Sequence, residues 1–317
     1  MSDSWRPTAN LSRIKARDEL YKKIRSFFSE KKYLEVDVPL LGSGGTTDRF
    51  IQSFYTQSEN KRFYLQTSPE FAMKRLLAAG SGPIYSLSKA FRQEEIGRFH
   101  NSEFTMLEWY RPGFDDHQLM DEVLELMNCF FDVDMSKISY QRIFEKFLFI
   151  DPHRDSIDKI KSKITELLDV NDIGDETDKD VLLDILFSHL IQPKLKGKLF
   201  FIYDYPETQS ALARIKNNNE GVSIARRFEL FVDGIELANG YWELANSTEL
   251  RQRFEDDNSK RETLGLEVMN YDEHLIQAMD SGLPDCAGVA LGVDRLLMLI
   301  EGAEKIEEVI VFPFDRS

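Results

Sequence analysis

The stretch "FRQEEIGRFHNSEFTMLEWY" concentrates side chains that bind anions, amines and aromatic rings. On a strand that ends at Arg92, Arg92 and Glu94 share one face, and Phe104, Glu108 and Tyr110 share one face of the strand that follows. A fixed arginine suits bidentate phosphate binding, and a neighbouring aromatic ring offers a purine a stacking surface. Glu108 and Tyr110 suit an amino group. The alternative is a surface hairpin with ordinary ion pairs.

Two acidic residues in "GIELANGYWEL" form a second candidate group. Glu236 and Glu243 are seven residues apart, so a regular strand would point them in opposite directions. A bulge or turn at Asn239-Gly240 would restore a common face. Paired carboxylates on one face, near phosphates, are suited to Mg²⁺. Alternatively, one of them is an ordinary surface glutamate.

The stretch "GVALGVDRLLML" predicts a strand that runs directly into a helix. Gly288 and Gly292 allow this strand to approach a ligand closely. Arg295 opens the helix, where a positive charge opposes the helix dipole and therefore favours a bound anion. The alternative is a tightly packed junction with a surface ion pair between Asp294 and Arg295.

These groups need a scaffold, and the flanking patterns predict its elements. Residues 10–32 have the spacing of an amphipathic helix, and residues 62–80 predict a strand, a turn and a helix. Ser68 is a suitable cap for that helix, with Pro69 at its first position and Glu70 at its mouth, although simple capping explains Ser68 and Glu70 equally well.

Further strands and helices follow the same pattern of hairpins and flanking helices. "YLEVDVPLL" alternates like a strand, and Asp233-Gly234 between two apolar runs predicts a hairpin. "STELRQRFEDDNSKRETLG" predicts a charged helix capped by Ser247 or Thr248. Residues 135–200 predict an inserted helical subdomain. The fold class is therefore α+β with a mostly antiparallel sheet. The sequence has neither GxGxxG after a first strand nor GxxxxGK[ST], which excludes a Rossmann dinucleotide domain and a P-loop protein.

Composition and charge limit the possible functions. With 317 residues, of which 42% are hydrophobic, the chain can bury a full core. Its apolar runs are too short to span a bilayer, and its start lacks a secretory h-region. Cys129 and Cys286 are the only cysteines, without CxxC spacing, which points to a reducing cytosol.

The net charge of −15 argues against a large nucleic-acid interface. Residues 1–35 nevertheless contain nine Lys or Arg against five Asp or Glu. They predict either a solvated helix face or a docking surface for an acidic partner.

The charged stretches resemble the motifs of class II aminoacyl-tRNA synthetases. "FRQEEIGRFHNSEFTMLEWY" resembles motif 2, "GVALGVDRLLML" resembles motif 3, and "FFSEKKYLEVDVPLL" is similar to the weaker motif 1. "EFTMLEWY" and "IELANGYWEL" point to the lysyl branch. Lysyl-tRNA synthetases carry an anticodon-binding domain ahead of motif 1, where this chain has only a short basic segment. The chain therefore resembles the elongation factor P–lysine ligases, which attach β-lysine to a lysine side chain of elongation factor P.

The resemblance implies a single catalytic domain over residues 1–317, without an anticodon-binding domain, and a cytoplasmic homodimer. It implies ATP as a substrate and Mg²⁺ as a metal, with no membrane partner and no use of tRNA. The implied catalytic residues are Arg92 and Arg295; the implied ATP-binding residues are Arg92, Glu94, His100, Asn101, Phe104, Glu236, Leu237, Gly292 and Arg295. The substrate pocket would contain Ser68, Pro69, Glu70, Glu108, Tyr110, Glu243 and Ala290, and Glu236 and Glu243 would hold the metal.

One departure bears on the substrate. Lysyl-tRNA synthetases usually have glycine where motif 3 of this chain has Ala290. The added methyl group predicts a preference for a β-amino over an α-amino substrate. Two other functions stay open: a minimal enzyme that charges tRNA, and a non-catalytic ligand sensor, although such sensors tend to lose the motif arginines that this chain retains.

Overall fold

The structure is a computed structural model that describes residues 5–93, 96–168 and 176–317. Glu94, predicted to bind the nucleotide, lies outside the described residues. The chain divides into two compact units. The first unit combines Met1–Phe131 with Leu244–Ser317, and the second is Asp132–Glu243.

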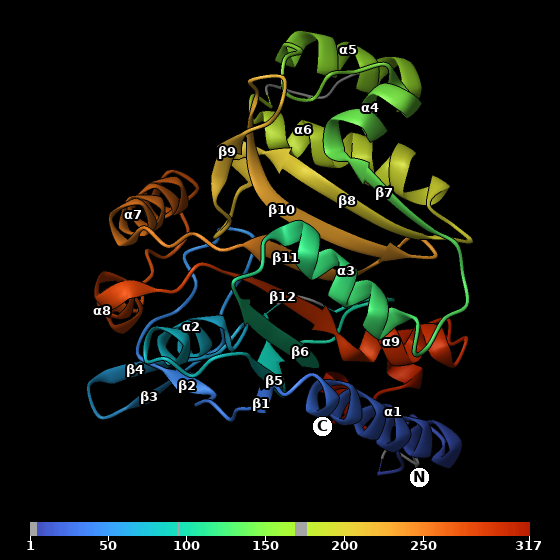
Figure 1. Cartoon of the computed structure of the whole chain (residues 1–317), viewed down its shortest axis with the longest axis vertical. Helices are drawn as coiled ribbons and strands as arrows, with labels where there is room; N and C mark the ends of the chain where they lie inside the picture. The colour runs from blue at the N-terminus through green and yellow to red at the C-terminus, as the bar shows by residue number, and fades with distance from the viewer. Residues whose placement is uncertain (1–4, 94–95, 169–175) are drawn as a thin grey trace. The chain divides into compact units, whose positions relative to one another are not determined.

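The strands of the first unit carry the predicted motifs 2 and 3 (Figure 1). Their order is β1 (Leu34–Glu35), β5 (Ile84–Phe91), β6 (Glu103–Pro112) and β12 (Cys286–Gly292). β5 and β6 form the predicted antiparallel pair, β12 is antiparallel to β6, and β1 is parallel to β5. A second sheet has the order β2 (Leu41–Gly42), β4 (Lys61–Leu65) and β3 (Tyr55–Ser58).

The strand predicted over residues 33–41 is much shorter than its alternation suggests. Only Leu34–Glu35 pairs with β5, and Leu41–Gly42 pairs with β4 in the other sheet. Pro39, which has no N–H to donate to a ladder, lies between these two short strands.

Helices cover one face of the first unit's strands. Trp109 of β6 is fully buried, with its ring 5.3 Å from that of Phe28 and its Nε1 donating to Glu122 Oε1 at 3.2 Å. Phe28 belongs to α1 (Leu11–Glu30) and Glu122 to α3 (Asp116–Met127). α9 (Val293–Ile300) also packs on β6. The face of β6 that contains Trp109 is thus packed in the core. The opposite face, which contains Glu108, is therefore the one that can form a site.

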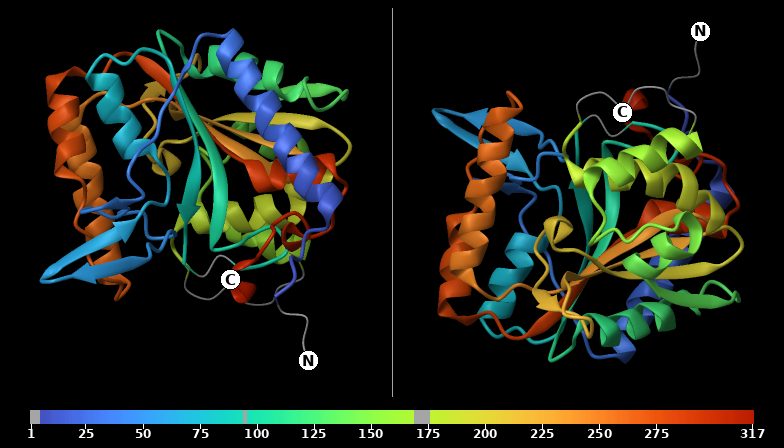
Figure 2. Two further views of the ribbon diagram at one scale, coloured as in Figure 1. Left: turned by 90° about the horizontal axis from the view of Figure 1, so that it is seen from below. Right: turned by 90° about the horizontal axis from the view of Figure 1, so that it is seen from above.

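A second group of helices packs together in the same unit. It consists of α2 (Glu70–Ala78), α7 (Ser247–Thr263) and α8 (Glu273–Gly282), and Figure 2 shows α7 and α8 side by side. The cap predicted for α7 was wrong by one residue. The side chain of Asn246, and not that of Ser247 or Thr248, accepts the N–H of Glu249 at 3.0 Å.

Much of the basic N-terminal segment is engaged within the chain. Arg17 pairs with Asp294 at 2.5 Å and Arg13 with Glu308 at 2.7 Å. Arg25 pairs with Glu35 at 3.0 Å. These ion pairs engage part of the segment within the chain, and the choice between a solvated helix face and a docking surface for an acidic partner stays a prediction.

The second unit has its own strands, in the order β11 (Ile235–Trp242), β10 (Ser223–Val232), β8 (Leu199–Pro206) and β7 (Met135–Ser139), with β9 (Ile215–Asn217) paired to β10. The predicted hairpin at Asp233-Gly234 is confirmed. Both turn residues have positive φ, 51° and 78°, as a type I′ turn requires. β7 is parallel to β8, and the other pairs are antiparallel.

The described part of the segment predicted as a helical insertion, residues 135–168 and 176–200, contains mainly helices, with β7 at its start and the first residues of β8 at its end. Its helices are α4 (Tyr140–Leu148), α5 (Ile157–Leu168), α6 (Lys179–Leu186), a π-helix (Phe187–Ile191) and a 3₁₀ turn (Gln192–Lys194). They share one hydrophobic core with Ile202 and Phe231 of the strands. Short 3₁₀ turns occur at Glu207–Gln209, Ile306–Glu308 and Phe314–Arg316. Among the described residues, no helix is both long and apolar enough to cross a membrane.

Candidate active site

A buried carboxylate lies at the centre of the β6 face that the sequence selected. Glu108 is 2% exposed, and its two oxygens accept hydrogen bonds from Ser68 Oγ and Tyr110 Oη, each at 2.6 Å. Ala290 of β12 pairs directly with Glu108 in the ladder. Burying a charged carboxylate is costly unless it is hydrogen-bonded, and the two hydroxyls reduce this cost while fixing its orientation. The structure therefore brings these four predicted pocket residues together.

The start of α2 supplies the hydroxyl that reaches Glu108. Ser68 Oγ also accepts the backbone N–H of Glu70 at 3.0 Å, but Ser68 is not the N-cap of the helix as the sequence predicted. The helix begins at Glu70, which places Pro69 at the cap position instead of the predicted first helical position. Glu70 Oε1 binds Lys74 Nζ at 2.6 Å, and Lys74 is 2% exposed.

The predicted pairing of an arginine with an aromatic ring is present beyond the end of β5. The guanidinium carbon of Arg92 lies 5.2 Å from the ring centre of Phe104. Its Nε donates to the carbonyl of Thr67 at 3.4 Å, and its backbone N–H donates to Ser102 O at 2.9 Å. The arginine is thus held above an aromatic plane at the mouth of the hairpin.

The second predicted arginine approaches the same loop from α9. Arg295 lies in the first turn of this helix, its Nε donates to Phe99 O at 3.2 Å, and its Nη2 lies 2.6 Å from His100 Nε2. Motifs 2 and 3, far apart in the chain, therefore meet through Arg295 and the loop at 99–100.

The surface ion pair considered between Asp294 and Arg295 was wrong. Asp294 is 3% exposed, and its oxygens accept from Arg17 Nη2 at 2.5 Å and from the backbone N–H of Thr105 at 2.6 Å. Asp294 fastens α9 to β6 and α1, which fixes the direction in which Arg295 leaves the helix.

Two other residues were predicted to bind the nucleotide, Asn101 and Gly292, and Asn101 has hydrogen-bond partners within the protein. Asn101 is 7% exposed; its Nδ2 donates to Glu103 O at 2.6 Å, and its Oδ1 accepts from Phe314 N at 3.0 Å. At Gly292, an added Cβ would lie 3.7 Å from the Arg295 side chain, which is ordinary contact. The protein alone does not require glycine there, so a role in making room for a nucleotide stays a prediction.

In the second unit, β11 contains the irregularity that the two glutamates require. Phe231 pairs with Glu236 and Leu230 with Ala238, so Leu237 is an extra residue in the ladder. The predicted bulge exists, but it lies at Leu237 and not at Asn239-Gly240. Beyond it, alternation places Glu243 on the same face as Glu236. Leu237 itself is buried, at 2% exposed.

A third acidic residue on that face was missed by the sequence analysis. Glu229 of β10 is two residues before Phe231, which pairs with Glu236, so Glu229 and Glu236 share a face. Burial and the nearby charge of Glu236 raise the pKa of the Glu229 carboxyl, and Arg227 opposes this shift. The sequence could have revealed Glu229, because the Asp233-Gly234 turn sets the register that places it on the same face as Glu236. The carboxylates of Glu229 and Glu236, on one strand face, are a donor set that suits Mg²⁺.

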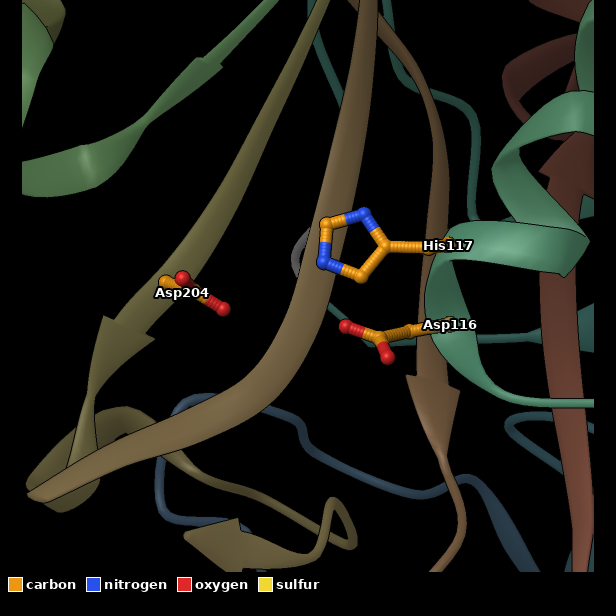
Figure 3. Close-up of side chains that lie close together, drawn as sticks. All are labelled: Asp116, His117 and Asp204. Carbon is orange, nitrogen blue, oxygen red and sulfur yellow. The ribbon is translucent and has the colours of Figure 1, made fainter. Parts of the chain in front are cut away.

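Figure 3 shows three further side chains of metal-binding type that the sequence analysis did not select. Asp116 and His117 project from the first turn of α3 in the first unit, and Asp116 is fully buried. Asp204 projects from β8 in the second unit and has a left-handed φ of 58°.

The hairpin with its carboxylate pocket and the two arginines belong to the stretches that resemble motifs 2 and 3 of class II synthetases. Residues 3–316 match the family of class II tRNA synthetases (D, K and N). The chain belongs to this family.

Curated relatives resemble the chain over their whole length. It is 46% identical to a Vibrio atlanticus protein named elongation factor P--(R)-beta-lysine ligase, with 100% of each chain covered. Proteins with the same name from Photobacterium profundum (45% identical, 99% of each chain) and Photorhabdus laumondii (46%, 99% of this chain and 98% of the relative) are similarly close. These relatives confirm the resemblance inferred from the sequence motifs.

Proposed function

We propose that this chain is an ATP-dependent ligase that activates (R)-β-lysine as its adenylate and transfers it to a lysine side chain of elongation factor P. One observation carries the activation step: β6 presents an arginine-covered aromatic ring and a buried carboxylate on one face. Phe104 and Arg92 suit the nucleotide, and Glu108 suits the substrate amino group. The names of the full-length relatives support the choice of substrate and acceptor.

In the first step, a carboxylate oxygen of the substrate attacks the α-phosphorus of ATP. The new P–O bond forms as the bond to pyrophosphate breaks, and no covalent enzyme intermediate is required. Arg92 and Arg295 hold the phosphates in line and offset their negative charge. Glu108 fixes the substrate amino group, so that the carboxylate points toward the phosphate.

In the second step, the acceptor amine attacks the carbonyl carbon of the adenylate, and AMP leaves with the electron pair of the broken C–O bond. A free lysine amine has a pKa of about 10.4, so it must lose a proton before it attacks. Phosphate oxygens of the leaving group or solvent are the acceptors that we consider for this proton.

The acidic residues of the second unit fit the divalent cation that such a reaction uses. We assign Glu229 and Glu236 as the carboxylate pair, because they share one strand face across the β10–β11 hairpin. Glu243, the partner predicted from the sequence, lies on the same face and stays a proposed contact of both the cation and the substrate. The cation would neutralise charge on the phosphates.

The deciding experiment separates the two half-reactions. ATP–pyrophosphate exchange is measured with α-lysine and with both β-lysine enantiomers, and label transfer to elongation factor P and to tRNA(Lys) is then followed. Exchange with (R)-β-lysine and labelled protein are expected. Exchange with α-lysine and labelled tRNA would instead identify a minimal synthetase, and ATP binding without exchange would identify a sensor.

A further inference from the structure

The carboxylate of Glu229 is held at both oxygens by side chains of the second unit. Arg227 Nη2 donates to Oε1 at 2.5 Å, and Tyr205 Oη donates to Oε2 at 2.7 Å. We name Arg227, Tyr205 and Glu229 the carboxylate clamp. Glu229 is 9% exposed and Tyr205 is 4% exposed, so both bonds lie away from solvent and hold their geometry.

The clamp is itself fixed by its surroundings. Arg227 Nη1 donates to the carbonyl of Gln209 at 2.8 Å, and its guanidinium carbon lies 4.7 Å from the ring centre of Tyr205. The Tyr205 ring in turn lies 4.7 Å from that of Tyr140, the first residue of α4. The helical insertion thus packs behind the clamp and restricts the rotamers of its members.

The backbone is irregular at the place where the clamp forms. Ala225 pairs with Tyr205 and Phe228 with Tyr203, so two residues of β10 lie opposite one residue of β8. That single residue, Asp204, has a φ of 58°. Such bulges redirect side chains next to active sites. Here the irregularity precedes Tyr205, whose hydroxyl reaches Glu229.

A purely stabilising role does not account well for this arrangement. Burying an arginine–glutamate pair costs desolvation that its attraction only partly offsets, and apolar residues of similar volume are often at least as stabilising. An orienting role explains it better, because a carboxylate has about four acceptor positions and the clamp uses one on each oxygen. Glu229 shares a strand face with Glu236, and we assign its remaining acceptor positions to a cation.

We propose that Arg227 and Tyr205 are positioning residues that hold Glu229 beside Glu236 in the orientation that binds a divalent cation. The proposal rests on the metal assignment made with the proposed function. It also gives the helical insertion a role, since Tyr140 supports the clamp from behind. Partners that orient metal ligands typically change metal affinity 10- to 100-fold when they are removed, which sets the expected effect at about that size.

The test measures Mn²⁺ binding by electron paramagnetic resonance, with a non-hydrolysable ATP analogue and no lysine. Arg227→Met should weaken Mn²⁺ binding about 10- to 100-fold, and Tyr205→Phe about tenfold. Arg227→Lys should restore part of the loss, because an ammonium group can still donate to Glu229. Arg226→Met, the adjacent arginine, is the matched control and should bind Mn²⁺ like the wild type.

Two further measurements exclude a merely structural effect. Urea unfolding should show folded Tyr205→Phe protein, and its exchange rate should return toward the wild-type value at saturating Mn²⁺. If Arg227→Met does not fold, the Mn²⁺ affinities of Arg227→Lys and Tyr205→Phe decide whether the clamp positions Glu229. Wild-type Mn²⁺ affinity in the folded clamp variants would overturn the proposal.

The failure of the clamp and the failure of the proposed function give different results. If Glu229→Gln weakens Mn²⁺ binding and the clamp variants do not, only the positioning role is wrong. If Glu229→Gln binds Mn²⁺ like the wild type, Glu229 is not a metal ligand, and the positioning role of the clamp is also wrong. Absence of exchange with any lysine, with Mn²⁺ binding as expected, would refute the ligase alone.

Discussion

At the residue scale, the site depends on side chains that orient other side chains. Ser68 and Tyr110 donate to Glu108, and Asp294 ties the start of α9 to Thr105. Residue types and spacing were enough to predict the first group, since its members lie in recognisable motifs. They were not enough for Asp294, because its partner Arg17 is 277 positions away in the chain. Only the folded structure shows that contact.

Arg295 should affect the activation step directly. Arg295→Ala should lower the rate of ATP–pyrophosphate exchange on the order of 10²–10³-fold, the usual cost of removing a preorganised donor to a charged transition state. Arg98→Ala is the control, because Arg98 lies in the loop whose residues 99–100 contact Arg295. Arg98 is exposed, and its Nε donates to Glu304 O at 2.8 Å. Equal exchange rates in both variants would contradict the assignment of Arg295.

Ala290 should set the choice between substrate isomers. Its methyl group is on the residue paired with Glu108, the proposed partner of the substrate amino group. Ala290→Gly should therefore improve exchange with α-lysine relative to (R)-β-lysine, by about tenfold or more if one methyl group counts as in other pockets. The ratio of kcat/KM for the two lysines measures this. An unchanged ratio would show that Ala290 does not determine specificity.

At the element scale, the sequence predicted most strands and helices, because hairpin turns and apolar periodicity are local signals. The Asp233-Gly234 turn is an example. The bulge in β11 was predicted at Asn239-Gly240 but occurs at Leu237, because the position of the extra residue depends on cross-strand pairing. The shortened strand near Pro39 has a similar cause, since its length depends on which partner strands are within reach.

The N-cap of α7 is Asn246 in the structure, whereas the sequence predicted Ser247 or Thr248, and mutations can distinguish these assignments. Asn246→Ala should lower the free energy of unfolding by about 1 kcal/mol, because the N–H of Glu249 loses its acceptor. Thr248→Ala, at one of the positions favoured by the sequence, should have little effect, and Asn246→Asp should retain the cap. Urea denaturation followed by circular dichroism measures all three. A larger loss for Thr248→Ala would return the cap to that residue.

His153 should make the helical insertion sensitive to acid. Burial lowers the pKa of its imidazole, and among the described residues its Nε2 has no hydrogen-bond partner. The unfolded chain therefore binds a proton more readily, so the stability that His153 contributes is lost as the pH falls from about 6.5 through the lower folded-state pKa. His153→Asn should flatten this slope in urea unfolding between pH 7.5 and 5.5. An identical slope in both proteins would refute the prediction.

At the scale of the whole molecule, exposed apolar residues in the predicted motif 1 support a homodimer. Leu34 is 55% exposed and Leu41 is 46% exposed, although both lie in strands. Exposed apolar surface can mark an interface between protein chains. We therefore expect a dimer of the 36.8 kDa chain in light scattering coupled to size exclusion.

Charge placed at this surface should separate the dimer. Leu41→Asp should yield the monomer mass, because an unpaired carboxylate buried in an interface is costly. Phe149→Asp is the matched control: Phe149 is 81% exposed at the end of α4 in the second unit, so its replacement should leave the mass unchanged. A dimer that persists in Leu41→Asp would place the interface elsewhere, and a monomeric wild type would refute the homodimer itself.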